Sequence, residues 1–168
     1  MSRVVRIVPL ASLALALGCQ NASQPPLNLG PRRAAWIPDS AATLAHEHYS
    51  GFGQAVQLAV ADASTWENVW AQLYGGRQPT PPLPAVDFRV ERVVVAALGG
   101  RGSGGHAIGI DSLVTYELGS IVYLTGTAPG SDCVVTGALT QPVHAVRVSP
   151  PPAEPIAFQQ RSVVHECS

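Results

Sequence analysis

The sequence predicts an α+β fold, with a compact, mainly antiparallel β domain and one principal amphipathic helix. Several short segments alternate apolar and polar residues, as half-buried strands do, and one segment carries apolar residues at helical spacing. The 168 residues include 16 glycines and 15 prolines, too many turn-forming residues for a helical bundle. The segments between the predicted strands leave no room for βαβ repeats, so we expect antiparallel pairing.

The amino-terminal segment has the pattern of an export signal. Arg3 and Arg6 precede an uncharged apolar run over residues 7–17, which is too short for a membrane span of about 20 residues. The run ends in LALGC, which resembles the bacterial lipobox, whose cysteine receives diacylglycerol. We therefore predict a lipoprotein signal peptide over residues 1–18 and lipidation of Cys19. The alternatives are an ordinary signal peptide with a chance cysteine, or a buried apolar segment.

Acylation would anchor the mature protein to a membrane through palmitate-like chains. Gln20 follows the cysteine where Asp could stand, a pattern that resembles outer-membrane lipoproteins in cells with two membranes. We expect a lipid-anchored cell-envelope protein, in the outer membrane if the cell has two membranes. Residues 19–45 are rich in Pro, Asn, Gln and Ser, and we expect a flexible tether there.

The first elements of the folded part are two short strands and the helix. Residues 46–50 and 56–60 carry strand-like alternation. Ser64 and Glu67 have the spacing of a capping box, which predicts a helix that begins at Thr65. The double glycine at 75–76 predicts its end.

The apolar face of this helix contains two indoles. Trp66, Val69, Trp70 and Leu73 recur at helical spacing. We expect this face to pack in the core, because an amphipathic helix needs a buried face. The alternative is that both indoles are exposed and stack on sugar rings in a carbohydrate-binding module.

The strands beyond the helix start with the most apolar one. Residues 92–98 form a nearly continuous apolar run, typical of a central strand covered on both faces. A glycine-rich loop over residues 99–105 follows, and we expect it to be a tight hairpin connection. Further strands are predicted over four segments: 106–111, 113–117, 120–127 and 142–148.

Cys133 and Cys167 are the two cysteines other than Cys19. In an exported chain, such a pair most simply forms a disulfide. It would join the carboxyl-terminal segment to the loop after the strand at 120–127. Two free thiols are the alternative.

Composition excludes several classes of function. Charged residues make up 12% of the chain and the formal net charge is −1, which disfavours nucleic-acid binding. All ten basic residues are arginines, so Schiff-base and lysine general-base chemistry and lysine-containing phosphate loops are absent. We expect no cofactor.

The motifs that could carry catalysis or a metal are weak. Ser103 resembles a nucleophile elbow, but Arg101 occupies the position where a glycine is required two residues earlier. His46 and His48 would point to one side of a strand, yet two ligands do not make a metal site. Asp87 is better read as a turn or amide cap than as a catalytic acid. We predict no catalytic and no metal-binding residues.

The glycine loop is the best candidate for an interaction site. Arg101 is its only charged residue and could bind a carboxylate of a partner, with Ser103 and His106 beside it. Flanking glycines would allow another backbone to approach closely. The alternative is a solvated arginine on an ordinary hairpin.

From Trp66 onward the sequence resembles the carboxyl-terminal domain of the PrcB family, bacterial lipoproteins named for a subunit of a surface protease complex. The resemblance rests on the segments TWENVWAQL, PLPAVDF, RVVVAALGGR, SGGHAIGI and VTGALTQPVHAVRV. His106 stands where family members tend to have an aromatic residue, so a contact made there by a tyrosine ring could differ. Residues 46–168 would thus form a PrcB-like α+β domain.

The resemblance implies a non-catalytic accessory protein of the cell envelope that binds another protein. Its partner would be an exported protease or another envelope protein, which it would stabilise or assemble. A carbohydrate-binding module and a divergent hydrolase are the alternatives. A pocket that unites Ser103, a histidine and Asp87 would favour the hydrolase.

Overall fold

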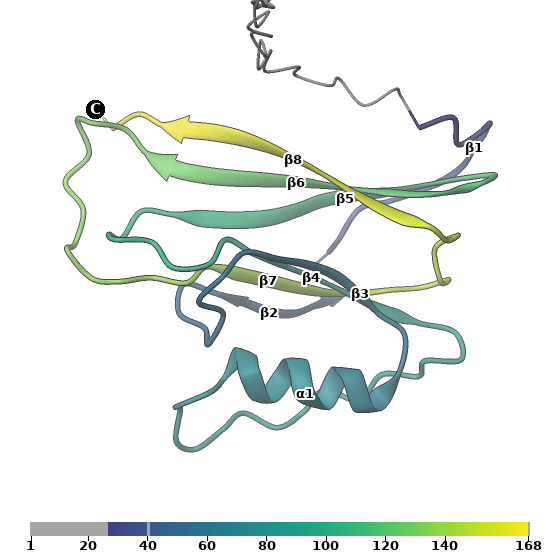
Figure 1. Cartoon of the computed structure of the whole chain (residues 1–168), viewed down its shortest axis with the longest axis horizontal. Coiled ribbons are helices and arrows are strands. Elements are labelled where there is room, and N and C mark those ends of the chain that lie inside the picture. The colour runs from purple at the N-terminus through teal and green to yellow at the C-terminus, as the bar shows by residue number, and fades with distance from the viewer. Residues whose placement is uncertain (1–26, 40, 168) are drawn as a thin grey trace, which may run out of the picture.

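Two four-stranded β-sheets and one helix lie in three layers, in the order sheet, sheet, helix (Figure 1). The computed structural model describes residues 27–39 and 41–167. We call the sheet with strand order β1-β5-β6-β8 the outer sheet and the sheet with order β2-β7-β4-β3 the central sheet. The elements are β1 Arg32–Trp36, β2 Thr43–Glu47, β3 Val56–Val60, α1 Ala63–Leu73, β4 Arg92–Ala97, β5 Ala107–Tyr116, β6 Gly119–Pro129, β7 Val143–Val148 and β8 Ile156–His165.

The predicted α+β class is confirmed. All strand pairs are antiparallel except β6 and β8, which run parallel. The segments predicted as two strands at 106–111 and 113–117 form one strand, β5, with a shift in register between Ile110 and Ser112. Strand β8 was not predicted, because its half-exposed mixture of Gln, Ser and Val lacks a clear alternation.

Strand β4 explains how the three layers are held together. Val93, Val95 and Ala97 belong to the core between the central sheet and α1. Val94 and Ala96 belong to the second core, between the two sheets. Successive side chains of a strand point to opposite faces, so a continuous apolar run fits a strand with a core on each side. The prediction for this segment is confirmed.

Helix α1 covers the central sheet with the four predicted residues, Trp66, Val69, Trp70 and Leu73, all buried. The predicted start was wrong by two residues. Asp62, not Ser64, is the N-cap, and its carboxylate accepts from the Thr65 amide at 2.9 Å. Aspartate competes well with serine at this position because its charged oxygen also meets the positive end of the helix dipole.

The predicted tether over residues 19–45 is wrong for its second half. Strand β1 pairs with β5, and β2 pairs with β7, so the folded part begins well before residue 46. Both strands pair with partners far along the chain, and β1 is flanked by Pro31 and Pro38, which obscure its short alternation in the sequence. The expected signal peptide, Cys19 and the first half of the tether lie outside the described residues.

The glycine loop after β4 is not the expected hairpin. β4 and β5 belong to different sheets, so residues 98–106 carry the chain from the central sheet to the outer one. Gly99 has φ of +77°, and a Cβ there would lie 2.7 Å from the backbone of Gln54 and Ala55. Only glycine allows this turn to pass so close to another segment.

The carboxyl-terminal strand β8 lies at the edge of the outer sheet (Figure 1). A disulfide joins Cys133, in the loop after β6, to Cys167, just beyond β8. This pairing confirms the prediction from cysteine parity. No helix in the described part of the chain is long and apolar enough to cross a membrane.

Candidate binding site at the Arg101 cavity

A cavity of about 180 Å³ lies between the outer sheet and the segment that leaves β4; we call it the Arg101 cavity. Three parts of the chain form it: the sheet-crossing loop, the end of β6 and the middle of β8. Its lining residues are Leu98, Arg101, His106, Gly126, Thr127, Ala128, Gln160 and Ser162.

The backbone of Arg101 is fixed by a two-way bridge to Thr140. The Arg101 amide donates to the Thr140 carbonyl at 2.8 Å, and the Thr140 amide donates back at 3.0 Å. The Thr140 hydroxyl also donates to the Ser103 carbonyl at 2.8 Å. The arginine is therefore presented by a rigid loop, which reduces the conformational entropy lost when a ligand binds.

The guanidinium of Arg101 has unused hydrogen-bonding capacity. Its Nη2 donates to the Leu98 carbonyl at 3.0 Å, whereas its buried Nε has no hydrogen-bond partner. Among the described residues, no carboxylate forms an ion pair with Arg101, although five other arginines have one: Arg33, Arg77, Arg89, Arg147 and Arg161.

A buried donor without an acceptor costs free energy, and an unpaired cation attracts anions. A carboxylate entering the cavity would supply the countercharge that the guanidinium lacks. The arrangement can therefore bind an anionic group. This is the chemistry expected of Arg101 from the sequence.

The structure brings two of the three predicted interaction residues together. Arg101 and His106 line the same cavity. Ser103 does not line it, and its hydroxyl donates to the Gly104 carbonyl at 3.2 Å. Sequence reasoning missed Gln160 and Ser162, because nothing in the sequence shows that β8 runs parallel to β6 and closes the cavity.

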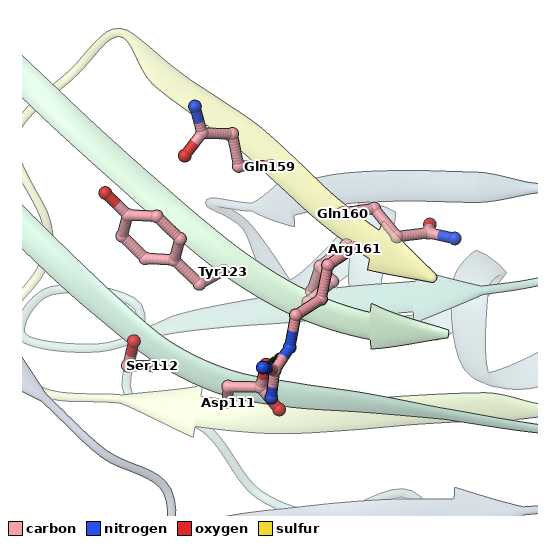
Figure 2. A pocket seen from close by; sticks show the side chains of 7 residues that line it. Asp111, Ser112, Tyr123, Gln159, Gln160 and Arg161 are labelled. Carbon is pink, nitrogen blue, oxygen red and sulfur yellow. Dashed lines mark ion pairs between the residues drawn. The ribbon is translucent and has the colours of Figure 1, made fainter. Parts of the chain in front are cut away.

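A second, larger hollow of about 550 Å³ lies on the outer sheet, lined by β5, β6 and β8 (Figure 2). Its charged groups neutralise each other. Arg161 Nε donates to the Thr125 hydroxyl at 2.7 Å and lies 3.8 Å from an Asp111 oxygen. Tyr123 and Gln159 complete the polar lining. Because this arginine already has a carboxylate, the hollow lacks the unmet charge of the Arg101 cavity.

Two histidines form a stacked pair between the sheets. The rings of His46 and His144 are 4.3 Å apart between centroids, with planes 20° apart. His144 Nδ1 accepts from the Ile110 amide at 2.9 Å, and His46 Nε2 lies 3.1 Å from the Ile108 carbonyl oxygen. Burial, followed by the nearby His46, lowers the pKa of His144 to about 4. The pair therefore links β2 and β7 to β5.

The weighed metal and hydrolase sites are not assembled in the described part of the chain. No three His, Cys, Asp or Glu side chains there are grouped to hold a metal ion. His46 stacks on His144, and both His46 and His48 are exposed. Asp87 forms a bidentate pair with Arg89 in a turn, and this pairing lowers the pKa of the Asp87 carboxyl to about 2. The hydrogen-bond partners of Ser103 include neither a histidine nor an aspartate.

The indoles of α1 are not a sugar-binding surface. Trp66 and Trp70 are 1% and 5% exposed. Their indole N–H groups donate to the carbonyls of Pro84 and Pro81 at 3.1 and 3.0 Å. Core packing is thus confirmed for both rings, and the observation that would have favoured carbohydrate binding is missing.

The fold is a small two-sheet domain with a cavity beside Arg101, whose backbone is held by the bridge to Thr140. Residues 92–149 match the family model described as PrcB C-terminal. The resemblance noted from the sequence is confirmed for that segment, which runs from β4 to the end of β7 and includes Arg101 and His106. No curated protein and no solved structure matches the chain.

Proposed function

We propose that this protein is a non-catalytic accessory subunit that binds an exported protease or another cell-envelope protein. The match of residues 92–149 to the PrcB C-terminal family carries the proposal, because that family is named for a subunit of a protease complex. The Arg101 cavity supports it, since a rigid, unpaired cation suits recognition of a carboxylate on another molecule.

The proposal includes a lipid anchor at Cys19. The lipobox-like sequence LALGC and the apolar run before it support acylation in the cell envelope, in the outer membrane where the cell has two. Anchoring would confine the binding domain to the surface on which an exported partner is found. It would also raise the effective concentration of the two proteins for each other.

Site-specific photo-cross-linking in the native host tests the proposed function. A photoreactive residue replaces His106, beside the cavity, and a control replaces exposed Gln72 on α1, in the opposite layer. The expected result is one cross-linked envelope protein at His106 and none at Gln72. Deletion of the gene for this chain should also reduce the amount or activity of that protein.

Two results would contradict the proposal. Equal cross-linking at both positions would mean that the cavity is not a specific contact surface. A specific cross-link to a protein whose abundance, assembly and activity are unchanged by the deletion would refute the accessory role.

A further inference from the structure

The four edge strands of the two sheets in the described structure, β1, β8, β2 and β3, differ in how well they are protected against pairing with a strand of another protein. Edges of sheets expose unpaired backbone N–H and C=O groups, and proteins usually protect them by shortness, bulges or charge. Strands β1, β2 and β3 are each five residues long, and the pairing of β1 and β2 with their neighbours contains register shifts.

Strand β8 is neither short nor bulged, and it carries little charge. It is ten residues long, and its register with β6 continues without a shift from Ile156 to His165. It contains no proline, and its only acid or base other than His165 is Arg161, which is paired with Asp111. Val163 and Val164 are 40% and 56% exposed. The disulfide to Cys167 holds the end of the strand in place.

The open edge and the Arg101 cavity are contiguous. Gln160 and Ser162 line the cavity, and because they are two residues apart they share one face of β8. A strand added alongside β8 would direct every second side chain toward that same face. One of these side chains could therefore reach the side of the sheet on which Arg101 lies.

We propose that β8 and the Arg101 cavity together bind an extended, carboxylate-bearing peptide segment of the partner protein, added as a further strand to the outer sheet. The inference rests on the proposed function and specifies its partner. Backbone hydrogen bonds to β8 supply affinity, and the carboxylate supplies the countercharge that Arg101 lacks.

Charge distinguishes this occupant from a second copy of the same chain. The residues of β8 on the cavity side, Gln160, Ser162 and Val164, carry no carboxylate. A β8 strand from a second molecule would therefore leave Arg101 unpaired. An acidic segment compensates the charge and is the occupant that this edge fits.

Binding of labelled strand-forming peptides to the purified full chain in detergent tests the inference. The probe is a short alternating Thr-Val peptide with one central Glu, and its control has Gln at the same position. The Glu peptide should bind about tenfold more tightly, as expected for one charge-assisted hydrogen-bonded pair. Arg101→Gln should abolish this preference, while Arg33→Gln, the matched loss of charge on β1 at the opposite edge of the same sheet, should retain it.

Backbone pairing is tested with two N-methylated versions of the Glu peptide, methylated at alternate residues. An added strand turns only one set of its N–H groups toward β8, so one version should bind and the other should not. A carboxylate held by charge alone would bind equally in both versions.

Several results would overturn the inference: equal affinity of the Glu and Gln peptides for the unmodified protein, equal binding of both methylated versions, or no binding at about 1 mM peptide. A stable dimer that the Glu peptide fails to dissociate would assign the edge to a second copy.

The comparison of the Glu and Gln peptides on the unmodified protein tests the inference even if Arg101→Gln does not fold. A partner that still cross-links at His106 while the peptides fail would leave the proposed function standing and this inference refuted.

Discussion

The most direct test of the packing between the two sheets is the pH dependence contributed by His144. Its side chain is 6% exposed, and its Nδ1 must remain unprotonated to accept from the Ile110 amide. Burial and the nearby His46 lower the pKa of His144 from 6.5 to about 4, although Asp111 acts in the opposite direction. We predict that this histidine makes the folded state less stable as the solution becomes mildly acidic.

The direction follows from which state takes up the proton. Above pH 6.5 the ring is neutral in both the folded and the unfolded state, and its full contribution to stability is present. As the pH falls from 6.5 to about 4, the unfolded state binds a proton that the folded state does not, so the free energy of unfolding decreases. Below about pH 4 both states are protonated and this contribution is constant.

The size of the effect follows from the shift in pKa. Each pKa unit corresponds to about 1.4 kcal/mol, so the displacement from 6.5 to about 4 amounts to at most about 3.5 kcal/mol. Solvent screening at the partly open edge of the ring pair reduces the expected loss to about 2 kcal/mol. The pKa values of Asp62 and Asp87 are lowered from 3.8 to about 2, so their contributions to stability are lost mainly below pH 4 and are the same in a variant of His144.

The assay is urea unfolding at intervals between pH 7.5 and pH 4 for the unmodified protein and for His144→Asn. Asparagine does not titrate, and its amide oxygen can take the place of Nδ1 as acceptor for Ile110. The variant should be less stable at pH 7.5 because it is smaller, yet it should lose about 2 kcal/mol less over this pH range. Parallel pH profiles for the two proteins would refute the reasoning about His144.

The remaining predictions concern the core, the covalent links and the cavity. Trp70→Ala should lower the free energy of unfolding by about 3 to 5 kcal/mol in urea titration, because it leaves a cavity and an unpaired Pro81 carbonyl; a loss below about 1.5 kcal/mol would contradict the packing. Peptide mapping without reductant should find Cys133 joined to Cys167, and two alkylatable thiols in the native protein would argue against the bond. Cys19→Ser should remain an uncleaved precursor without acyl mass, whereas equal acyl mass in both proteins would exclude lipidation at this residue. Arg101→Glu should weaken cross-linking of the partner without changing the melting temperature, and unchanged cross-linking would make this arginine an ordinary loop residue.

Local sequence patterns were sufficient to predict those elements whose apolar residues recur at a single clear spacing. The helical spacing of Trp66 to Leu73 and the continuous apolar run of β4 led to the correct elements, because burial on one face or on both leaves different patterns. Cysteine parity likewise led to the correct disulfide, since only two thiols were available in the predicted mature chain.

Pairing between distant segments was decided only by the tertiary structure. Strands β1 and β8 carry weak alternation and acquire strand geometry from their partners β5 and β6, so a segment read as tether became part of the sheet. The glycine loop showed where the chain turns but not that it changes sheets. The neighbours of Arg101 depend on that crossing and on the parallel pairing of β8, because residues over 50 positions apart meet only when both sheets have formed. The sequence by itself therefore pointed to the arginine as a candidate, and the fold determined the cavity that it lines.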